Sequence, residues 1–157
     1  MKLSLIQVGK TNEAFISEGL SLYYSRIRKM MPLEIIDVGT SKDARNKPEA
    51  LQKSEEAASI SAYFKKDDVI VLLDESGEQT SSRGLASYLQ KTMNSGPKRI
   101  VFVIGGPWGL GTELYGRAGM VLSLSRMTFP HQLVRLLFAE QLYRALTIIK
   151  GIPYHHD

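Results

Sequence analysis

Two loops near the C-terminus hold the residues whose types and spacing best suit ligand binding. Gly105–Gly111 contains four glycines, and glycine lets a backbone come close to a ligand. Their spacing fits neither a dinucleotide-binding motif nor a P-loop; a tight turn is the simpler alternative, but it needs fewer glycines. The second loop, Ser125–Pro130, includes Met127 and Phe129. These side chains could wall an adenine-like ring, or they could simply fill a core.

A long segment follows Pro130 and is predicted to form one helix as far as Lys150. Proline suits the first turn of a helix, and Gly151 stands where the helix would end. Apolar residues are spread around more than one face of this segment. Such a helix is buried, or it packs on a partner as well as on its own sheet. A homodimer is therefore the economical expectation.

Four chargeable side chains lie on this predicted helix. At about 100° per residue, His131 and Arg135 lie one turn apart on one side, whereas Glu140 and Arg144 pair on the far side. Each arginine could be the partner of a buried carboxylate, or it could bind an anion at a shared site. The tail, residues 152–157, contains a tyrosine and two histidines. It could stack on a base, or it could be a frayed terminus.

Strands are expected to alternate with helices along the chain, which favours a parallel α/β sheet. Both loops follow expected strands, and open α/β sheets bind ligands at the carboxyl ends of their strands. We expect a single domain, residues 1–157. The expected strands are Lys2–Val8, Leu33–Val38, Asp68–Leu73, Arg99–Ile104 and Met120–Leu124. The expected helices before the last one start near Thr11 or Asn12 and end near Lys29, cover Glu49–Phe64, and run from Ser81 or Ser82 to about Met93. Polar connections are expected at Gly39–Lys47 and Asp74–Gly77.

The composition excludes several classes of protein. Of 157 residues, 43% are hydrophobic and 23% are charged, which is typical of a globular protein. No run approaches the roughly 20 apolar residues of a membrane span, and the first residues do not resemble a signal peptide, so we expect a cytoplasmic protein. There is no cysteine, and two of the three histidines are adjacent near the end, so no metal site is expected. A net charge of +4 is compatible with an RNA partner but does not require one.

The motifs together resemble a known enzyme family. FVIGGPWGL, SLSRMTFPHQLVRLLFAEQLYRA and the terminal PYHH are similar to the bacterial large-subunit ribosomal RNA methyltransferase H family. Its members belong to the SPOUT superfamily and methylate N3 of a pseudouridine in 23S rRNA. The likeness extends over the whole chain, including the opening MKLSLIQVGK. It implies an α/β fold whose C-terminal segment forms a trefoil knot, and a homodimer packed through the knotted regions; knots are rare, and no periodicity in the sequence indicates one.

The resemblance also implies a cofactor site and a substrate site. The implied cofactor is S-adenosylmethionine, held at the ends of three expected strands by Leu73, Gly105, Leu124, Ser125, Arg126, Met127, Thr128 and Phe129. On the RNA side it implies His131, Arg135 and Glu140 as substrate-binding residues. It assigns no function to His156 or Asp157, and the function of Trp108 stays open.

The implied reaction is methylation of a pseudouridine in helix 69 of 23S rRNA, on the assembled ribosome. N3 carries a weakly acidic proton and is a poor nucleophile until that proton leaves. We expect Arg144 to stabilise the developing anion, His155 to act as the base or to position it, and Tyr154 to orient the ring. Three alternatives stay open: an RNA-binding dimer without activity, a flavodoxin-like or nucleotide-binding protein, and a methyltransferase that acts on another base.

Overall fold

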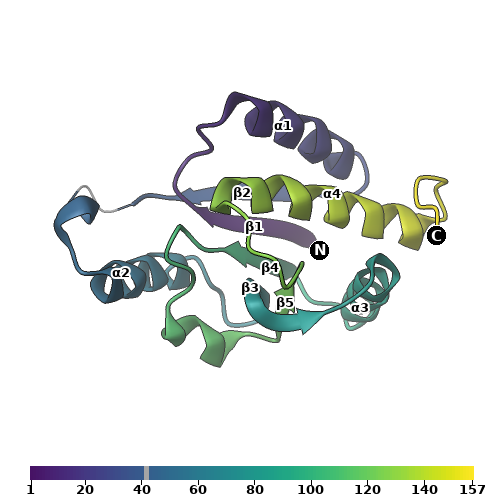
Figure 1. Ribbon diagram of the computed structural model, residues 1–157. Helices are drawn as coiled ribbons and strands as arrows, with labels where there is room; N and C mark the ends of the chain where they lie inside the picture. The colour runs from purple at the N-terminus through teal and green to yellow at the C-terminus, as the bar shows by residue number, and fades with distance from the viewer. Residues whose placement is uncertain (41–42) are drawn as a thin grey trace.

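The computed structural model describes residues 1–40 and 43–157, which fold around a parallel sheet (Figure 1). In this described part the sheet has five strands, in the order β2-β1-β4-β3-β5, and every pairing is parallel. The strands are β1 (Lys2–Val8), β2 (Leu33–Val38), β3 (Val69–Gln79), β4 (Arg99–Ile104) and β5 (Met120–Ser123). The helices are α1 (Ala14–Arg28), α2 (Glu49–Ser61), α3 (Ser82–Asn94) and α4 (His131–Lys150), with short 3-10 helices η1 (Ala44–Asn46) and η2 (Thr112–Arg117). The expected parallel α/β fold is confirmed.

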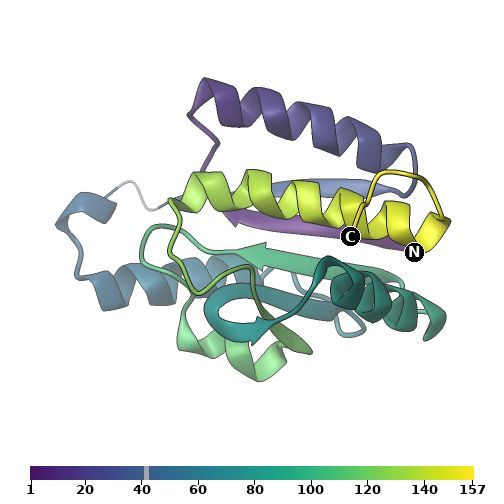
Figure 2. The same ribbon diagram turned by 45° about the vertical axis from the view of Figure 1, so that its right-hand side comes forward.

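The sheet is covered on both faces, and β4 shows why its sequence is apolar throughout. Ile100 and Phe102 pack in the core under α1, α3 and α4, whereas Val101 and Val103 pack in the core formed with α2 and η2. All six residues of β4 are buried, as expected for a central strand of a parallel sheet. Helix α4 lies between α1 and α3 over the first face (Figure 2).

Strand β3 does not end at the turn expected at Asp74–Gly77 but continues to Gln79. A local turn is present within it, where Ser76 N donates to Asp74 Oδ1 at 2.8 Å. The strand pairs with β5 twice: Leu122 is the partner of Leu73 and, after an irregular register shift, of Glu78. Figure 2 shows the resulting curve in the ribbon of β3. The chain thus bulges between Leu73 and Glu78 and pairs with β5 again at Glu78 and Gln79.

Smaller differences concern the ends of helices and one connection. Helix α2 ends at Ser61 rather than at Phe64, and α1 starts at Ala14, with no side chain capping it. Of the polar connection expected at Gly39–Lys47, residues 41–42 lie outside the described residues, and the rest includes η1. In the part of the chain that is described, we find no helix whose length and apolar character would let it span a bilayer.

Helix α4 starts and ends where the sequence indicates. Pro130 precedes its first residue, and Gly151 caps its C-terminus. Its inner face packs on the sheet through Phe138, whose ring lies 4.8 Å from that of Phe102, between centroids. The contact of Phe138 with Phe102 places the middle of α4 over the central strand β4.

The chain changes faces of the sheet near its C-terminus. The connection from β4 to β5 passes through η2, on the face that α2 covers. Residues 124–130 then return to the face of α1 and α3, where α4 packs. This change of face is consistent with the trefoil knot that the resemblance implies; the threading itself stays a prediction.

Candidate active site

A cavity of about 610 Å³ opens where β3, β4 and β5 end. Its volume lies in the range of ~300–1,000 Å³ that is typical of small-molecule sites. Seven of the eight residues expected around a cofactor line it: Leu73, Gly105, Leu124, Ser125, Met127, Thr128 and Phe129. The eighth, Arg126, has an exposed side chain and does not line the cavity. Three strand ends that are distant in sequence thus meet at one edge of the sheet.

The glycine-rich loop forms one wall of this cavity through a close backbone approach. A β-carbon on Gly105 would lie 2.9 Å from the carbonyl carbon of Gly109, which is too close for any larger residue. Gly109 has φ of +83°, where L-residues are strained. Trp108 also lines the cavity, and its Nε1 donates to Gln52 Oε1 on α2 at 3.2 Å. The loop is therefore narrow and tied to α2.

Sequence reasoning missed a charged part of the lining. Asp74 follows the apolar part of β3 and lines the cavity with Tyr115 of η2. Burial disfavours its charge, but hydrogen bonds from Ser76 and Tyr115 outweigh burial and lower the pKa of Asp74. Burial and the contact with Asp74 raise the pKa of Tyr115 to about 12. The available signal was a carboxylate just after a buried strand, which we assigned to a turn.

The N-terminal end of α4 brings His131 to the cavity and buries Arg135 beneath it. Burial, and then the charge of Arg135, lower the pKa of His131, so its imidazole is neutral near pH 7. Arg135 is 0% exposed. Its Nη1 donates to Thr11 Oγ1 at 2.9 Å, and its Nη2 donates to the Val8 carbonyl. The expected contact of Arg135 with RNA therefore does not match the structure, because the guanidinium joins α4 to the end of β1.

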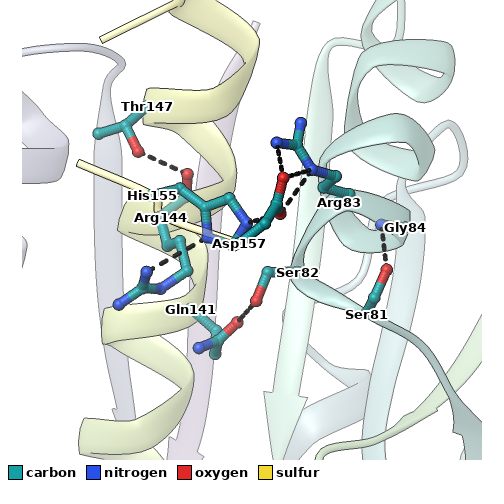
Figure 3. A network of polar contacts seen from close by, with 9 residues as sticks. All are labelled: Ser81, Ser82, Arg83, Gly84, Gln141, Arg144, Thr147, His155 and Asp157. Atoms are coloured by element: carbon teal, nitrogen blue, oxygen red, sulfur yellow. Dashed lines mark hydrogen bonds and ion pairs between the residues drawn. The ribbon is translucent and has the colours of Figure 1, made fainter. Parts of the chain in front are cut away.

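The C-terminal end of α4 gathers the three residues expected to act on the substrate. The Arg144 guanidinium lies 4.8 Å from the centroid of the Tyr154 ring. Its Nη1 lies 3.3 Å from Nδ1 of His155 (Figure 3). Its Nε donates to Glu140 Oε1 at 3.0 Å, and this hydrogen bond raises the pKa of Arg144. The pairing of Glu140 with Arg144, expected from their spacing, is confirmed.

Glu140 serves this cluster as an internal counter-ion. Its Oε1 accepts from the Tyr154 hydroxyl at 3.0 Å as well as from Arg144, and its Oε2 accepts from Gln141 Nε2 at 2.8 Å. Burial, with hydrogen bonds to Tyr23 and Glu140, raises the pKa of Tyr154, so the phenol stays neutral. The expected contact of Glu140 with RNA stays a prediction; within the chain both of its carboxylate oxygens accept from neighbouring side chains.

The cavity and the tail cluster lie far apart within one chain. We use the name tail cluster for Glu140, Arg144, Tyr154 and His155. At ~1.5 Å per residue, α4 rises roughly 20 Å from His131 to Arg144. An apolar groove of about 730 Å³ between α1, α3 and α4 connects the two regions. Its lining begins with Leu124 and Phe129, which the cavity shares, and ends with Glu140 and Gln141.

Comparison with known proteins places this architecture in a family. The sequence profile described as "Predicted SPOUT methyltransferase" matches residues 1–155. The chain belongs to the SPOUT methyltransferase family. The "Ribosomal RNA large subunit methyltransferase H" of Christiangramia forsetii is 45% identical to this SPOUT chain over 99% of each sequence. The protein of the same name in Parabacteroides distasonis is 42% identical over 100% of each.

A solved structure shares the fold. It is described as a probable methyltransferase from Bordetella pertussis Tohama I, and it is 13% identical to this SPOUT chain. The TM-score is 0.57, with 92% of this chain and 94% of that chain covered. The resemblance seen in the sequence motifs is thus confirmed at the level of family and fold, and the chain is a methyltransferase. Among the residues that the structure describes, no group of three His, Cys, Asp or Glu side chains could hold a metal ion.

Proposed function

We propose that this SPOUT methyltransferase transfers a methyl group from S-adenosylmethionine to N3 of a pseudouridine in helix 69 of 23S rRNA. The proposed substrate is the assembled ribosome, and the proposed location is the cytoplasm. The observation that carries the proposal is the match, over essentially the full length, to relatives named ribosomal RNA large subunit methyltransferase H. A net charge of +4 is small for a protein that would have to find one nucleotide in naked RNA, which favours a preassembled target.

The residues around the cavity fit S-adenosylmethionine. Met127 and Phe129 offer apolar surface for the adenine, and the glycine-rich loop offers backbone groups at close range. Asp74, whose lowered pKa keeps it ionised, can accept from an ammonium group. When bound, the cofactor supplies an electrophilic methyl group. The chain's own contribution at this end is to hold and orient the donor.

The tail cluster fits the other half of the reaction. Arg144 is a fixed cation that can stabilise negative charge as the N3 proton leaves. Glu140 holds Arg144 in place and keeps Tyr154 oriented, so that the phenol ring can stack on or hydrogen-bond to the uracil. His155 lies beside Arg144 with 15% of its side chain exposed. It takes up the proton or positions the group that does.

A homodimer is the arrangement that brings the cavity and the tail cluster together. The groove between them presents the apolar side chains of Leu124, Phe129, Leu136 and Leu137, which a second copy can cover. Two-fold contacts are self-complementary, so antiparallel α4 helices would place the tail cluster of one subunit near the cavity of the other. Each active site in this proposal combines a cofactor cavity with the tail cluster of the partner subunit.

Transfer of labelled methyl groups tests the proposal. Whole ribosomes, large subunits and naked rRNA, each from cells lacking this gene, are incubated with the protein and labelled S-adenosylmethionine. We expect label at N3 of a helix 69 pseudouridine, strongest with whole ribosomes. Label on another base would contradict the target. No label despite measured cofactor binding would contradict the substrate while leaving the family assignment intact.

A further inference from the structure

The tail is fixed to the first turn of α3 by Asp157 (Figure 3). Arg83 Nε donates to the two carboxylate oxygens of Asp157 at 2.8 and 3.1 Å, and Nη2 donates to Oδ2. The start of α3 is itself well anchored: Ser81 caps the helix, and Ser82 Oγ donates to Gln141 Oε1 on α4 at 2.7 Å. We call the contact between Arg83 and Asp157 the clasp. It holds the tail on a rigid element.

The clasp places His155 between an obligate acceptor and an obligate donor. Its Nε2 lies 2.9 Å from Asp157 Oδ1, and its Nδ1 lies 3.3 Å from Nη1 of Arg144. An ionised carboxylate can only accept hydrogen bonds, and a guanidinium can only donate them. The neutral imidazole therefore satisfies both neighbours in one tautomer, with the proton on Nε2 and the lone pair on Nδ1.

The clasp is more exposed than a contact that stabilises the fold would be. The Arg83 and Asp157 side chains are 60% and 66% exposed, whereas that of His155 is 15% exposed. An exposed ion pair contributes little to folding. The hydrogen bond from Arg83, and then that from His155, lower the pKa of Asp157 to about 2. The carboxylate is thus ionised over the whole range in which the enzyme would work.

We propose that Arg83 and Asp157 are positioning residues for the methyl transfer, because they fix the tautomer and the orientation of His155. The inference rests on the proposed function of the tail cluster. It extends the substrate side of the site to α3 and to the residue after His156, to which the resemblance assigns no function. Because neither residue lines the cofactor cavity, their loss should lower turnover without weakening cofactor binding.

Replacement of Asp157 tests this inference. We expect Asp157→Ala to lower kcat roughly tenfold to a hundredfold, the cost of misplacing a reacting group, with KM for ribosomes and cofactor affinity within about twofold of their original values. Arg83→Met should lower kcat less, because the contact of Asp157 with His155 remains. His156→Ala, a change in the exposed neighbour of His155, is the control and should leave kcat unchanged.

Nitrogen-15 NMR of histidine-labelled protein gives a readout that needs no methyl transfer. The unaltered protein should show His155 with its proton on Nε2, and Asp157→Ala should show a mixture of tautomers. Unchanged spectra and unchanged kcat would overturn the proposal, and so would a loss of the dimer or a lower Tm in parallel with kcat. If Asp157→Ala changes the His155 spectrum but the unaltered protein methylates none of the substrates, the effect of the clasp on His155 stands and the proposed function is rejected.

The reversed pair distinguishes positioning of the imidazole from tethering of the tail. Arg83→Asp combined with Asp157→Arg restores an ion pair between the tail and α3, but it puts a donor opposite Nε2 of His155. We expect kcat of this double variant to stay as low as that of Asp157→Ala. Recovery to within about twofold of the original kcat would show that tethering alone matters and would overturn the tautomer assignment.

Discussion

The two arginines of α4 lie in opposite surroundings, although their sequence context is similar. Arg135 is 0% exposed, and among the described residues no carboxylate comes within ion-pair distance of it. Its Nη1 and Nη2 donate to the neutral acceptors Thr11 and Val8, whereas its buried Nε has no partner among the described residues. The side chain of Arg144 is 24% exposed and is paired with Glu140. A buried cation with neutral partners supports the fold, whereas a cation at the surface can meet a substrate.

The same contrast separates the two ends of α4. The N-terminal end lies at the cavity, where His131, whose pKa is lowered, and a narrow glycine-rich loop border a space lined by both polar and apolar side chains. The C-terminal end carries charged and aromatic groups connected by hydrogen bonds. Substitutions at the first end should therefore affect stability or cofactor affinity, and those at the second end should affect turnover.

The largest effect is expected from Arg144→Ala. Loss of one group that stabilises developing charge typically lowers kcat about 10²- to 10³-fold. Single-turnover methyl transfer should show this loss, while calorimetry should show unchanged cofactor affinity. Arg144→Lys, which keeps the charge but not the planar fork, should lie in between. A variant that binds the cofactor much more weakly, yet turns over normally at saturating cofactor, would contradict the proposed role of Arg144.

Gly105→Ala should weaken cofactor binding by roughly tenfold to a hundredfold, because forcing a methyl group into a packed site costs about 1–3 kcal/mol. The added β-carbon would lie 2.9 Å from the backbone of Gly109, so the wall of the cavity must shift. Gly116→Ala is the matched control, since a β-carbon there meets nothing within 4 Å. Titration calorimetry compares the two, and equal affinities would argue against a cofactor at this wall.

Arg135→Met should lower the free energy of unfolding by about 1–3 kcal/mol, because the buried Val8 carbonyl and Thr11 hydroxyl lose their donor. Turnover per folded enzyme should change little. Arg144→Met is the comparison and should lower the free energy of unfolding less, because Arg144 is partly exposed and Glu140 keeps Tyr154 and Gln141 as partners. Urea unfolding at one fixed protein concentration measures both variants. A larger loss of stability in Arg144→Met would reverse our assignment of the two arginines.

The smallest effect concerns pH. Burial lowers the pKa of His131 below its usual 6.5, so the unfolded chain binds more protons than the folded one between the folded pKa and 6.5. The contribution of His131 to stability is therefore complete above about pH 6.5 and is lost as the pH falls through the folded pKa. His131→Gln should flatten this part of the curve of unfolding free energy against pH. If the slope of unfolding free energy against pH is unchanged in His131→Gln, a group other than His131 causes the loss of stability in acid.

The sequence predicted the fold best where burial dictates every residue. The strand β4 and the helix α4 follow from apolar runs and from their end residues, Pro130 and Gly151. The continuation of β3 beyond Asp74–Gly77 was not predictable, because the polar residues Glu78 and Gln79 are part of the strand only through pairing with β5. Backbone pairing between segments distant in sequence leaves no local pattern.

The sequence predicted most of the residues that line the cavity, but not which of the expected site residues are buried or how the tail packs. Strand ends and motif resemblance located the lining of the cavity, including Leu73 and Phe129. The burial of Arg135 was not predictable, because its spacing from His131 also fits an exposed face. Nor does the sequence reveal that Tyr154 and His155 fold back onto Glu140 and Arg144, because those contacts depend on how the tail packs against α4.

The most direct test of the account is activity in a mixed dimer. One subunit carries Gly105→Val, which blocks its cavity, and the other carries Arg144→Ala; two affinity tags isolate the mixed species. If each site combines one subunit's cavity with its partner's tail cluster, the mixed dimer retains one intact site and about half of the original activity, although both parent homodimers are nearly inactive. A mixed dimer as inactive as its parents would contradict the shared site.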